Sequence, residues 1–144
     1  MPTEHTEYLE HANITVARLA PALQFLLTAL PSWRLRGQGE MDWFGTPIQW
    51  LHVGSDSHYI ALQSGGDGPP LHWQSRATGA KHVGIVVPDL DAVIARLQAA
   101  GHRMDHPGGA HPHRRSAYFC PDDLLQIEFV QYLSDQPAER NAYA

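Results

Sequence analysis

Three scarcities in this 144-residue sequence exclude whole classes of protein. The chain has one cysteine, Cys120, which cannot form a disulfide with another residue of the same chain. No stretch approaches the roughly 20 apolar residues of a membrane span, and the first ten residues lack the basic start and apolar run of an export signal. Lys and Arg number 10 against 15 Asp and Glu, a net charge of −5 that argues against a phosphate-binding surface. We therefore expect a cytoplasmic protein that binds neither nucleic acid nor a membrane.

Histidine is the residue type that stands out, with ten copies in the chain. Hydrophobic residues make up 43% of the sequence, and a chain of this length can bury a core without the help of a metal. Histidine is both a common metal ligand and an acid–base group, so the position of each copy decides its significance.

The sequence contains an internal repeat. A shift of 71 positions aligns HANITVARLAPALQFLLTAL, which begins at His11, with HVGIVVPDLDAVIARLQAAG, which begins at His82. Each copy opens with the two-residue alternation of a strand and continues with the 3.6-residue period of an amphipathic helix. Pro31 is expected to end the first helix and Gly101 the second.

Three more strands are predicted after each helix. In the first copy they lie near 33–39, 46–53 and 58–63, and in the second near 102–105, 114–119 and 124–131. The predicted fold class is α+β, with two tandem β-α-β-β-β modules that form a cupped eight-stranded mixed sheet in a single domain. The modules span about 8–63 and 80–132, a Gly- and Pro-rich linker joins them at about 64–79, and a polar tail covers 133–144.

Four polar residues occupy matching places in the two copies. His11 and His82 begin the first strands, and a shift of 65 positions aligns Gln63 with Glu128 on the last strands. If the modules pair about a pseudo-twofold axis, these side chains can converge on one site. Two imidazoles, a carboxylate and an amide oxygen suit Zn, Ni, Fe, Mn or Co better than calcium. Glu128 stands between two large apolar residues, where a carboxylate needs a partner or a metal.

Several segments together resemble the vicinal oxygen chelate superfamily, which includes glyoxalase I, extradiol dioxygenases, and the bleomycin and fosfomycin resistance proteins. They are EHANITV, WLHVGSDSHYIALQ, KHVGIVVPDLDAVIARLQAAG and AYFCPDDLLQIEFVQY. The resemblance implies a homodimer in which His11, His82 and Glu128 hold one divalent metal ion. It places Gln63 at a fourth ligand position where glyoxalase-like sites often have glutamate.

The implied activity is that of a metal-dependent enzyme whose small oxygen-rich substrate is chelated to the metal. The reaction is then either that of a lyase or isomerase of the glyoxalase kind or that of an extradiol-type dioxygenase. In the first case Glu128 is the expected base. In the second, the acid–base group is expected from His113 or His111, with Tyr118 as a further candidate. The alternative is a metal-free protein that binds a small molecule, as bleomycin resistance proteins do.

Substrate contacts are expected from three further residues. Tyr59 shares a strand face with Gln63, and Trp50 is a second aromatic candidate for the same cavity. Arg115, or its neighbour Arg114, can bind a substrate carboxylate or phosphate through paired hydrogen bonds.

Overall fold

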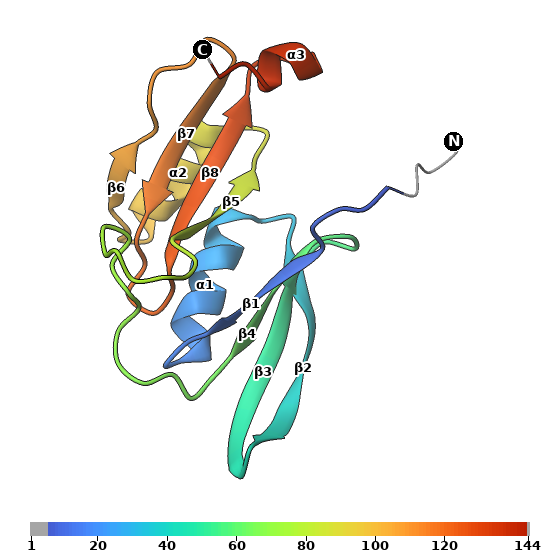
Figure 1. Ribbon diagram of the computed structural model, residues 1–144, viewed down its shortest axis with the longest axis vertical. Helices are drawn as coiled ribbons and strands as arrows, with labels where there is room; N and C mark the ends of the chain where they lie inside the picture. The colour runs from blue at the N-terminus through green and yellow to red at the C-terminus, as the bar shows by residue number, and fades with distance from the viewer. Residues whose placement is uncertain (1–5, 144) are drawn as a thin grey trace.

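The computed structural model describes residues 6–143 and contains both predicted modules (Figure 1). The first module consists of β1 (His11–Thr15), α1 (Leu19–Ala29), β2 (Arg34–Trp43), β3 (Thr46–Gly54) and β4 (Tyr59–Gln63). The second consists of β5 (His82–Val86), α2 (Leu90–Ala99), β6 (Met104–Pro107), β7 (Arg114–Phe119) and β8 (Gln126–Tyr132). A short helix, α3 (Pro137–Arg140), follows. None of the helices within 6–143 has the length and apolar content needed to cross a membrane.

The eight strands form two four-stranded sheets of the same topology. Their orders are β1-β4-β3-β2 and β5-β8-β7-β6. In each sheet the first strand of the module runs parallel to the last, and the remaining neighbours are antiparallel. The mixed sheets and the repeated module confirm the predicted fold, and each sheet leaves its first strand, β1 or β5, at an edge.

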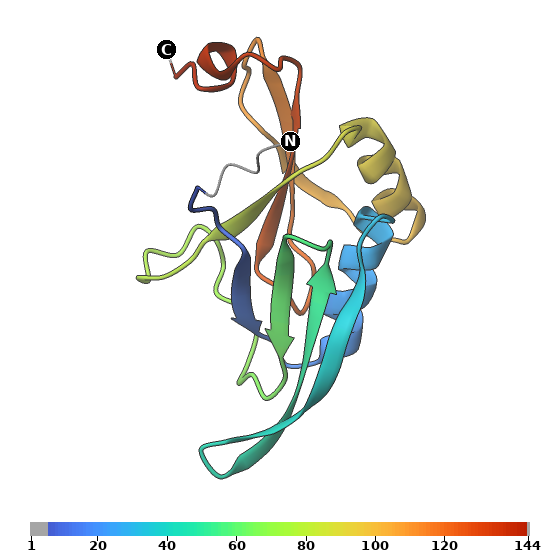
Figure 2. The same ribbon diagram turned by 90° about the vertical axis from the view of Figure 1, so that its right-hand side faces the viewer.

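One strand is longer than the sequence predicted. β2 continues to Trp43 because it pairs with β3 along its whole length in a hairpin that projects from the body of the molecule (Figures 1 and 2). The turn at its tip holds Phe44 at φ 49° and Gly45 at φ 91°, the left-handed pair that a two-residue hairpin turn requires. The Phe44 side chain is 90% exposed, so the tip of the hairpin contributes nothing to the core.

The two modules share one hydrophobic core, and Phe25 on α1 lies at their junction. Its ring lies edge-on to His102 at 5.0 Å between centroids, and it packs against Phe119 at 6.2 Å and Phe129 at 6.1 Å, both on the second sheet. Phe25, Phe119 and Phe129 are each no more than 1% exposed. A helix of the first module therefore covers part of the apolar face of the second sheet.

A polar contact reinforces this junction. Arg96 on α2 donates hydrogen bonds to the carbonyl oxygens of Thr28 and Ala29, at 3.2 and 2.9 Å. These carbonyls belong to the last turn of α1, where backbone acceptors have no partner within the helix. The contact fixes the end of one helix against the other.

The ends of α2 follow the capping signals of the sequence. Gly101 adopts φ 91° just beyond the helix, and its N–H donates to the Gln98 carbonyl at 3.0 Å. At the other end the Asp89 carboxylate accepts a hydrogen bond from the Ala92 N–H at 3.1 Å.

We predict that Asp89→Ala lowers the free energy of unfolding by about 1 kcal/mol, because it leaves the first backbone donors of α2 without their acceptor. Urea denaturation followed by circular dichroism measures the effect. Gln98→Ala, an exposed change near the other end of the same helix, is the control and should alter stability by less than about 0.5 kcal/mol. Equal effects of the two substitutions would contradict a capping role for Asp89.

Candidate functional site

Two of the predicted metal ligands meet on the polar face of the second sheet. β5 and β8 are neighbouring parallel strands, and Glu128 on β8 lies opposite Gly84, two residues after His82. Side chains two residues apart on a strand share a face, so the His82 ring and the Glu128 carboxylate point the same way. His82 Nε2 and Glu128 Oε1 are 3.4 Å apart, and the side chains keep 38% and 18% of their surface exposed. The pair is close enough to bind one cation and accessible enough to receive it.

Tyr118 joins this pair from the adjacent strand β7. It lies directly opposite Glu128 in the antiparallel ladder, and the His82 ring meets its ring edge-on at 5.3 Å between centroids. Burial, and next its hydrogen bond to the Glu128 carboxylate, raise the pKa of the Tyr118 phenol. Tyr118 therefore remains a protonated donor beside Glu128 at neutral pH.

His106 forms the outer wall of this group. Its ring stacks on Tyr118 with centroids 4.4 Å apart and planes 11° apart, and its Nδ1 lies 2.6 Å from the Asp105 carboxylate. The carboxylate fixes the orientation of the imidazole, and the imidazole in turn fixes the Tyr118 ring.

The polar face of the first sheet carries a stack of rings around Tyr59. His11 lies parallel to Tyr59 at 4.7 Å between centroids, and His52 stacks on it at 4.6 Å. The Arg36 guanidinium carbon lies 4.2 Å from the centre of the same ring, a cation–π contact. Burial, then the charge of Arg36 and then that of His11, lower the pKa of His52, and Glu10 opposes the shift. His52 is therefore neutral at pH 7.

Beside this stack the face is hollowed into a cavity of about 350 Å³, which we call the aromatic pocket. Trp50 forms one wall because its indole lies over Gly39, where a side-chain carbon would come within 3.0 Å of the ring. Trp50 and Tyr59, both predicted to contact substrate, thus line the same cavity. The full lining is His11, Asn13, Met41, Trp43, Trp50, His52, Tyr59, Ala61, Leu62 and Gln63.

The strand register corrects the expected equivalence of Gln63 and Glu128. In the second module, Glu128 lies on β8 opposite the residue two places after His82. The residue in the same relation to His11 on β4 is Ala61. Gapless alignment of the last strands missed this because the loops that precede them differ in length. Alanine thus occupies the position where a fourth ligand was expected.

Gln63 itself lies further along β4. It pairs with Thr15, four residues beyond the level of His11, which is about 13 Å along a strand. Its side-chain oxygen accepts a hydrogen bond from the Asn13 amide at 3.0 Å. Gln63 is therefore a buried residue of the aromatic pocket whose amide oxygen is engaged by Asn13, and it does not occupy the position that corresponds to Glu128.

Within one chain the two halves of the predicted site stay apart. Figure 1 looks onto the side of the second sheet away from α2, whereas Figure 2, turned by 90°, looks onto the side of the first sheet away from α1. The apolar sides of both sheets meet in the shared core, so their polar faces open toward different sides of the molecule. Over residues 6–143, no three His, Cys, Asp or Glu side chains come together as a metal site. A single chain thus offers His82 with Glu128 on one face and His11 on another.

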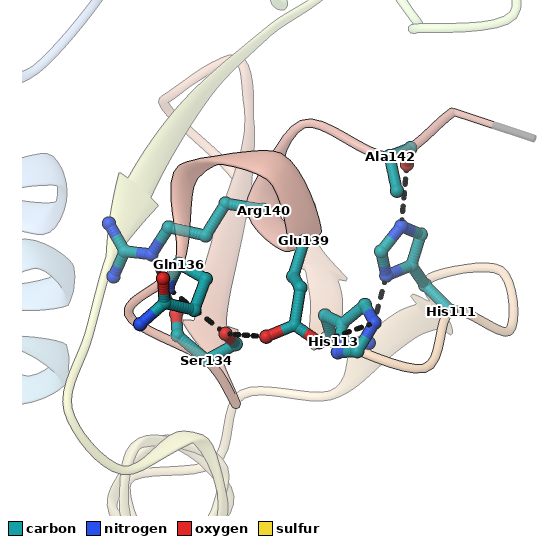
Figure 3. Close-up of polar contacts among 7 residues, drawn as sticks. All are labelled: His111, His113, Ser134, Gln136, Glu139, Arg140 and Ala142. Carbon is teal, nitrogen blue, oxygen red and sulfur yellow. Dashed lines mark hydrogen bonds and ion pairs between the residues drawn. The ribbon is translucent and has the colours of Figure 1, made fainter.

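His113 lies away from the His82–Glu128 pair. It precedes β7 and is five residues, about 16 Å of extended strand, from Tyr118. Its Nε2 lies 3.2 Å from the Glu139 carboxylate on α3, and the neighbouring His111 lies 2.7 Å from the Ala142 carbonyl oxygen (Figure 3). These contacts fold the predicted polar tail back onto the second module and give both histidines a structural role within the chain.

Arg115 faces the side of β7 opposite to Tyr118. Its guanidinium contacts both carboxylate oxygens of Asp91 on α2, at 2.8 and 3.2 Å. Arg114 occupies the same face as Tyr118, and its charge acts on the phenol. The alternation of side chains along β7 thus places Arg114, and not the predicted Arg115, on the face of the His82–Glu128 pair, four residues or about 13 Å along the strand from Tyr118.

Three residues of these faces were missed in the sequence: Arg36, His52 and His106. Strand parity could have found His52, which stands two residues after Trp50 on β3. Arg36 lies within a register shift of β2 between Leu35 and Gly37, and a similar shift separates His106 from Met104 in β6. Such bulges change which face a residue occupies, so simple alternation fails there.

Comparison with solved structures identifies the class of fold. The chain matches a glyoxylase/bleomycin resistance protein/dioxygenase domain from Frankia with a TM-score of 0.71 and 18% identity over 95% of this chain and 99% of that one. A glyoxalase family protein from Bacillus cereus matches with a TM-score of 0.70 and 16% identity over 93% and 99%. A variant of the fosfomycin resistance protein FosX from Listeria monocytogenes matches with a TM-score of 0.69 and 16% identity over 95% and 99%.

These structural neighbours are members of the vicinal oxygen chelate superfamily, and the chain has the glyoxalase-like fold that they share. No protein-family model matches the sequence, and the search of curated proteins found no match. At these identities the likeness shows the fold, and the argument for function rests on the residues themselves.

Proposed function

We propose that the protein is a metal-dependent enzyme that binds one divalent ion with His82 and Glu128 of one copy and His11 of a second copy. The observation that carries the proposal is the 3.4 Å approach of His82 Nε2 and Glu128 Oε1 on an accessible polar face. His11 holds the corresponding place at the start of β1. The donor set of two imidazole nitrogens and one carboxylate suits Mn, Fe, Co, Ni or Zn.

A second copy is needed because His11 of one chain lies on a different face from His82 and Glu128 of the same chain. β1 and β5 are both edge strands with free backbone groups, which favour association with another sheet. A cavity of about 420 Å³ lies between them, and Val86 and Leu9 on its lining are 61% and 82% exposed. A homodimer related by a twofold axis would cover this apolar surface and form two identical sites.

Alanine at position 61 shapes the chemistry of such a site. His82 and Glu128 of one copy and His11 of the other would hold the ion without a fourth protein ligand from position 61. The ion would supply Lewis-acid stabilisation of an anion on a bound oxygen-rich substrate. Tyr118 can donate a hydrogen bond to that anion or hold the Glu128 carboxylate in place, since its phenol stays protonated.

The structural neighbours support this class of activity. FosX from Listeria monocytogenes was solved as a complex with Mn(II) and a dihydroxypropylphosphonic acid, and the neighbours also include a trypanothione-dependent glyoxalase I from Leishmania major. For this chain we propose a small oxygen-rich substrate and either lyase/isomerase or extradiol-type dioxygenase chemistry. Oxygen consumption with catechols tests the dioxygenase branch, and turnover of methylglyoxal with a thiol tests the other.

Metal content is the direct test of the proposal. We expect protein purified without a histidine tag to contain about one divalent ion per chain by elemental analysis. His82→Ala and Glu128→Gln should lower affinity at least about tenfold in calorimetric titration with Mn(II) or Zn(II), because each removes a ligand. His72→Ala, which changes an exposed histidine outside both the proposed ligand set and the cavity between β1 and β5, is the control and should leave affinity unchanged.

The rival function is a metal-free protein that binds a small molecule. The aromatic pocket is the specific feature that favours it, because Trp50 and Tyr59 can hold a ligand without any metal. Wild-type protein that takes up no divalent ion but binds a ligand tightly would favour the rival and contradict the enzyme.

A further inference from the structure

We propose that the aromatic pocket binds a planar aromatic anion, with the ring on Trp50 and the negative group on Arg36. The inference deepens the proposed function and rests on it for the role of the ligand as substrate, because His11 lines the same pocket. It assigns Arg36 and His52 as residues that determine substrate specificity.

The shape of the pocket argues for a flat ligand. The aromatic rings of Trp50, His52 and Tyr59 line a cavity of about 350 Å³, which is within the range of small-molecule sites. Gly39 keeps the Trp50 indole flat against β2, since any side chain there would displace it. Aromatic rings prefer offset-stacked or edge-to-face contacts with other rings, so a planar ring gains more here than a bulky aliphatic group.

The rim of the pocket exposes apolar surface, and a ligand that covers this surface gains free energy of binding. Met41 and Trp43 line it and retain 41% and 45% of their surface in contact with water. Burying such apolar surface contributes roughly 25 cal/mol per Å². A ligand of one or two rings that reaches the rim covers both side chains.

The charges argue that the ligand is an anion. The lining contains no Asp or Glu, and Arg36 has no ion-pair partner among residues 6–143. Its guanidinium carbon lies 4.2 Å from the centre of the Tyr59 ring, and Tyr59 lines the cavity. The carboxylate of Glu10, next to the lining residue His11, is engaged by His11 Nδ1 at 2.9 Å. Arg36 thus offers a ligand in the pocket a permanent positive charge, and its planar fork suits a carboxylate or phenolate.

Ligand binding to the metal-stripped protein tests this inference separately from the proposed enzyme. The probe is 2-naphthoate, compared with the neutral 2-naphthylmethanol and with cyclohexanecarboxylate, an anion that is not planar. Calorimetric titration should show 2-naphthoate binding at least about tenfold more tightly than either comparison ligand. Equal affinity for the neutral ligand would overturn the role of charge, and equal affinity for the aliphatic anion would overturn the role of stacking.

Two arginines on the same strand provide a matched pair of variants. Arg36→Gln should remove the preference for 2-naphthoate over 2-naphthylmethanol, a loss of about tenfold. Arg34→Gln should retain the preference, because Arg34 is exposed and already paired with Asp56. Thermal unfolding of both variants checks that they remain folded, and unchanged selectivity in folded Arg36→Gln would overturn the assignment. Selective binding of 2-naphthoate by a protein that takes up no metal would contradict the proposed enzyme and support the aromatic pocket as a binding site. Metal uptake without selectivity for 2-naphthoate would contradict only the role of the pocket.

Discussion

Mixing two inactive variants should restore metal binding if the site is shared between two copies. His11→Ala and His82→Ala each remove one ligand from every site, so neither protein alone should bind the ion. When the two are unfolded together and refolded at equal amounts, half of the dimers contain one chain of each kind. In such a dimer, one site takes His82 and Glu128 from the first chain and His11 from the second and is complete. We expect about one quarter of the wild-type metal content.

The structural reason is the separation of the ligands within one chain. The polar faces of the two sheets open toward different sides of a shared core, and no three potential ligands meet within 6–143. A site confined to one chain would gain nothing from mixing, because each chain would still lack its own histidine. Recovery of no metal from the mixture would therefore contradict a shared site.

A second mixture tests the shared site through a decrease in metal content. The double variant His11→Ala/His82→Ala, refolded with an equal amount of wild type, should leave about one quarter of the wild-type metal content, because mixed dimers have no complete site. Sites confined to single chains would leave about one half. Elemental analysis after removal of free metal distinguishes the two values.

The largest effect on stability is expected from Phe25→Ala. Phe25 is 1% exposed and packs against Phe119 and Phe129 of the other module, so the substitution leaves a cavity at the junction of both halves. Losses for buried phenylalanine are about 3–5 kcal/mol, a large part of the 5–15 kcal/mol that stabilises a typical domain. We expect the urea midpoint to fall accordingly.

Phe44→Ala is the matched control, since that side chain is 90% exposed at the tip of the β2–β3 hairpin. It should change stability by less than about 0.5 kcal/mol. A loss below about 1 kcal/mol for Phe25→Ala would contradict a core shared by the two modules. Two separate unfolding transitions in the wild-type protein would contradict it as well.

The sequence by itself determined the repeated module and the class of fold. The shift that aligns His11 with His82 revealed two copies of one unit. In each copy the spacing of apolar residues changes from the two-residue period of a strand to the 3.6-residue period of a helix at the same place. Trp50 and Tyr59, predicted from the sequence to contact substrate, line one cavity with His11, and their contact with a substrate stays a prediction. These properties are local, since the spacing of neighbouring residues sets which face a side chain occupies.

Tertiary structure decided the register and the relation of the two sheets. Gln63 and Ala61 face the same way, so alternation could not choose between them, and only the pairing of β1 with β4 identified Ala61 as the counterpart of Glu128. The ion pair of Arg115 with Asp91 on α2 joins residues 24 apart in the sequence, and the alternation along β7 did not reveal it. His11 and His82 lie apart because the apolar sides of the two sheets pack together, with Phe25 of the first module against Phe129 of the second. Such a contact joins residues far apart in the sequence, and no local pattern encodes it.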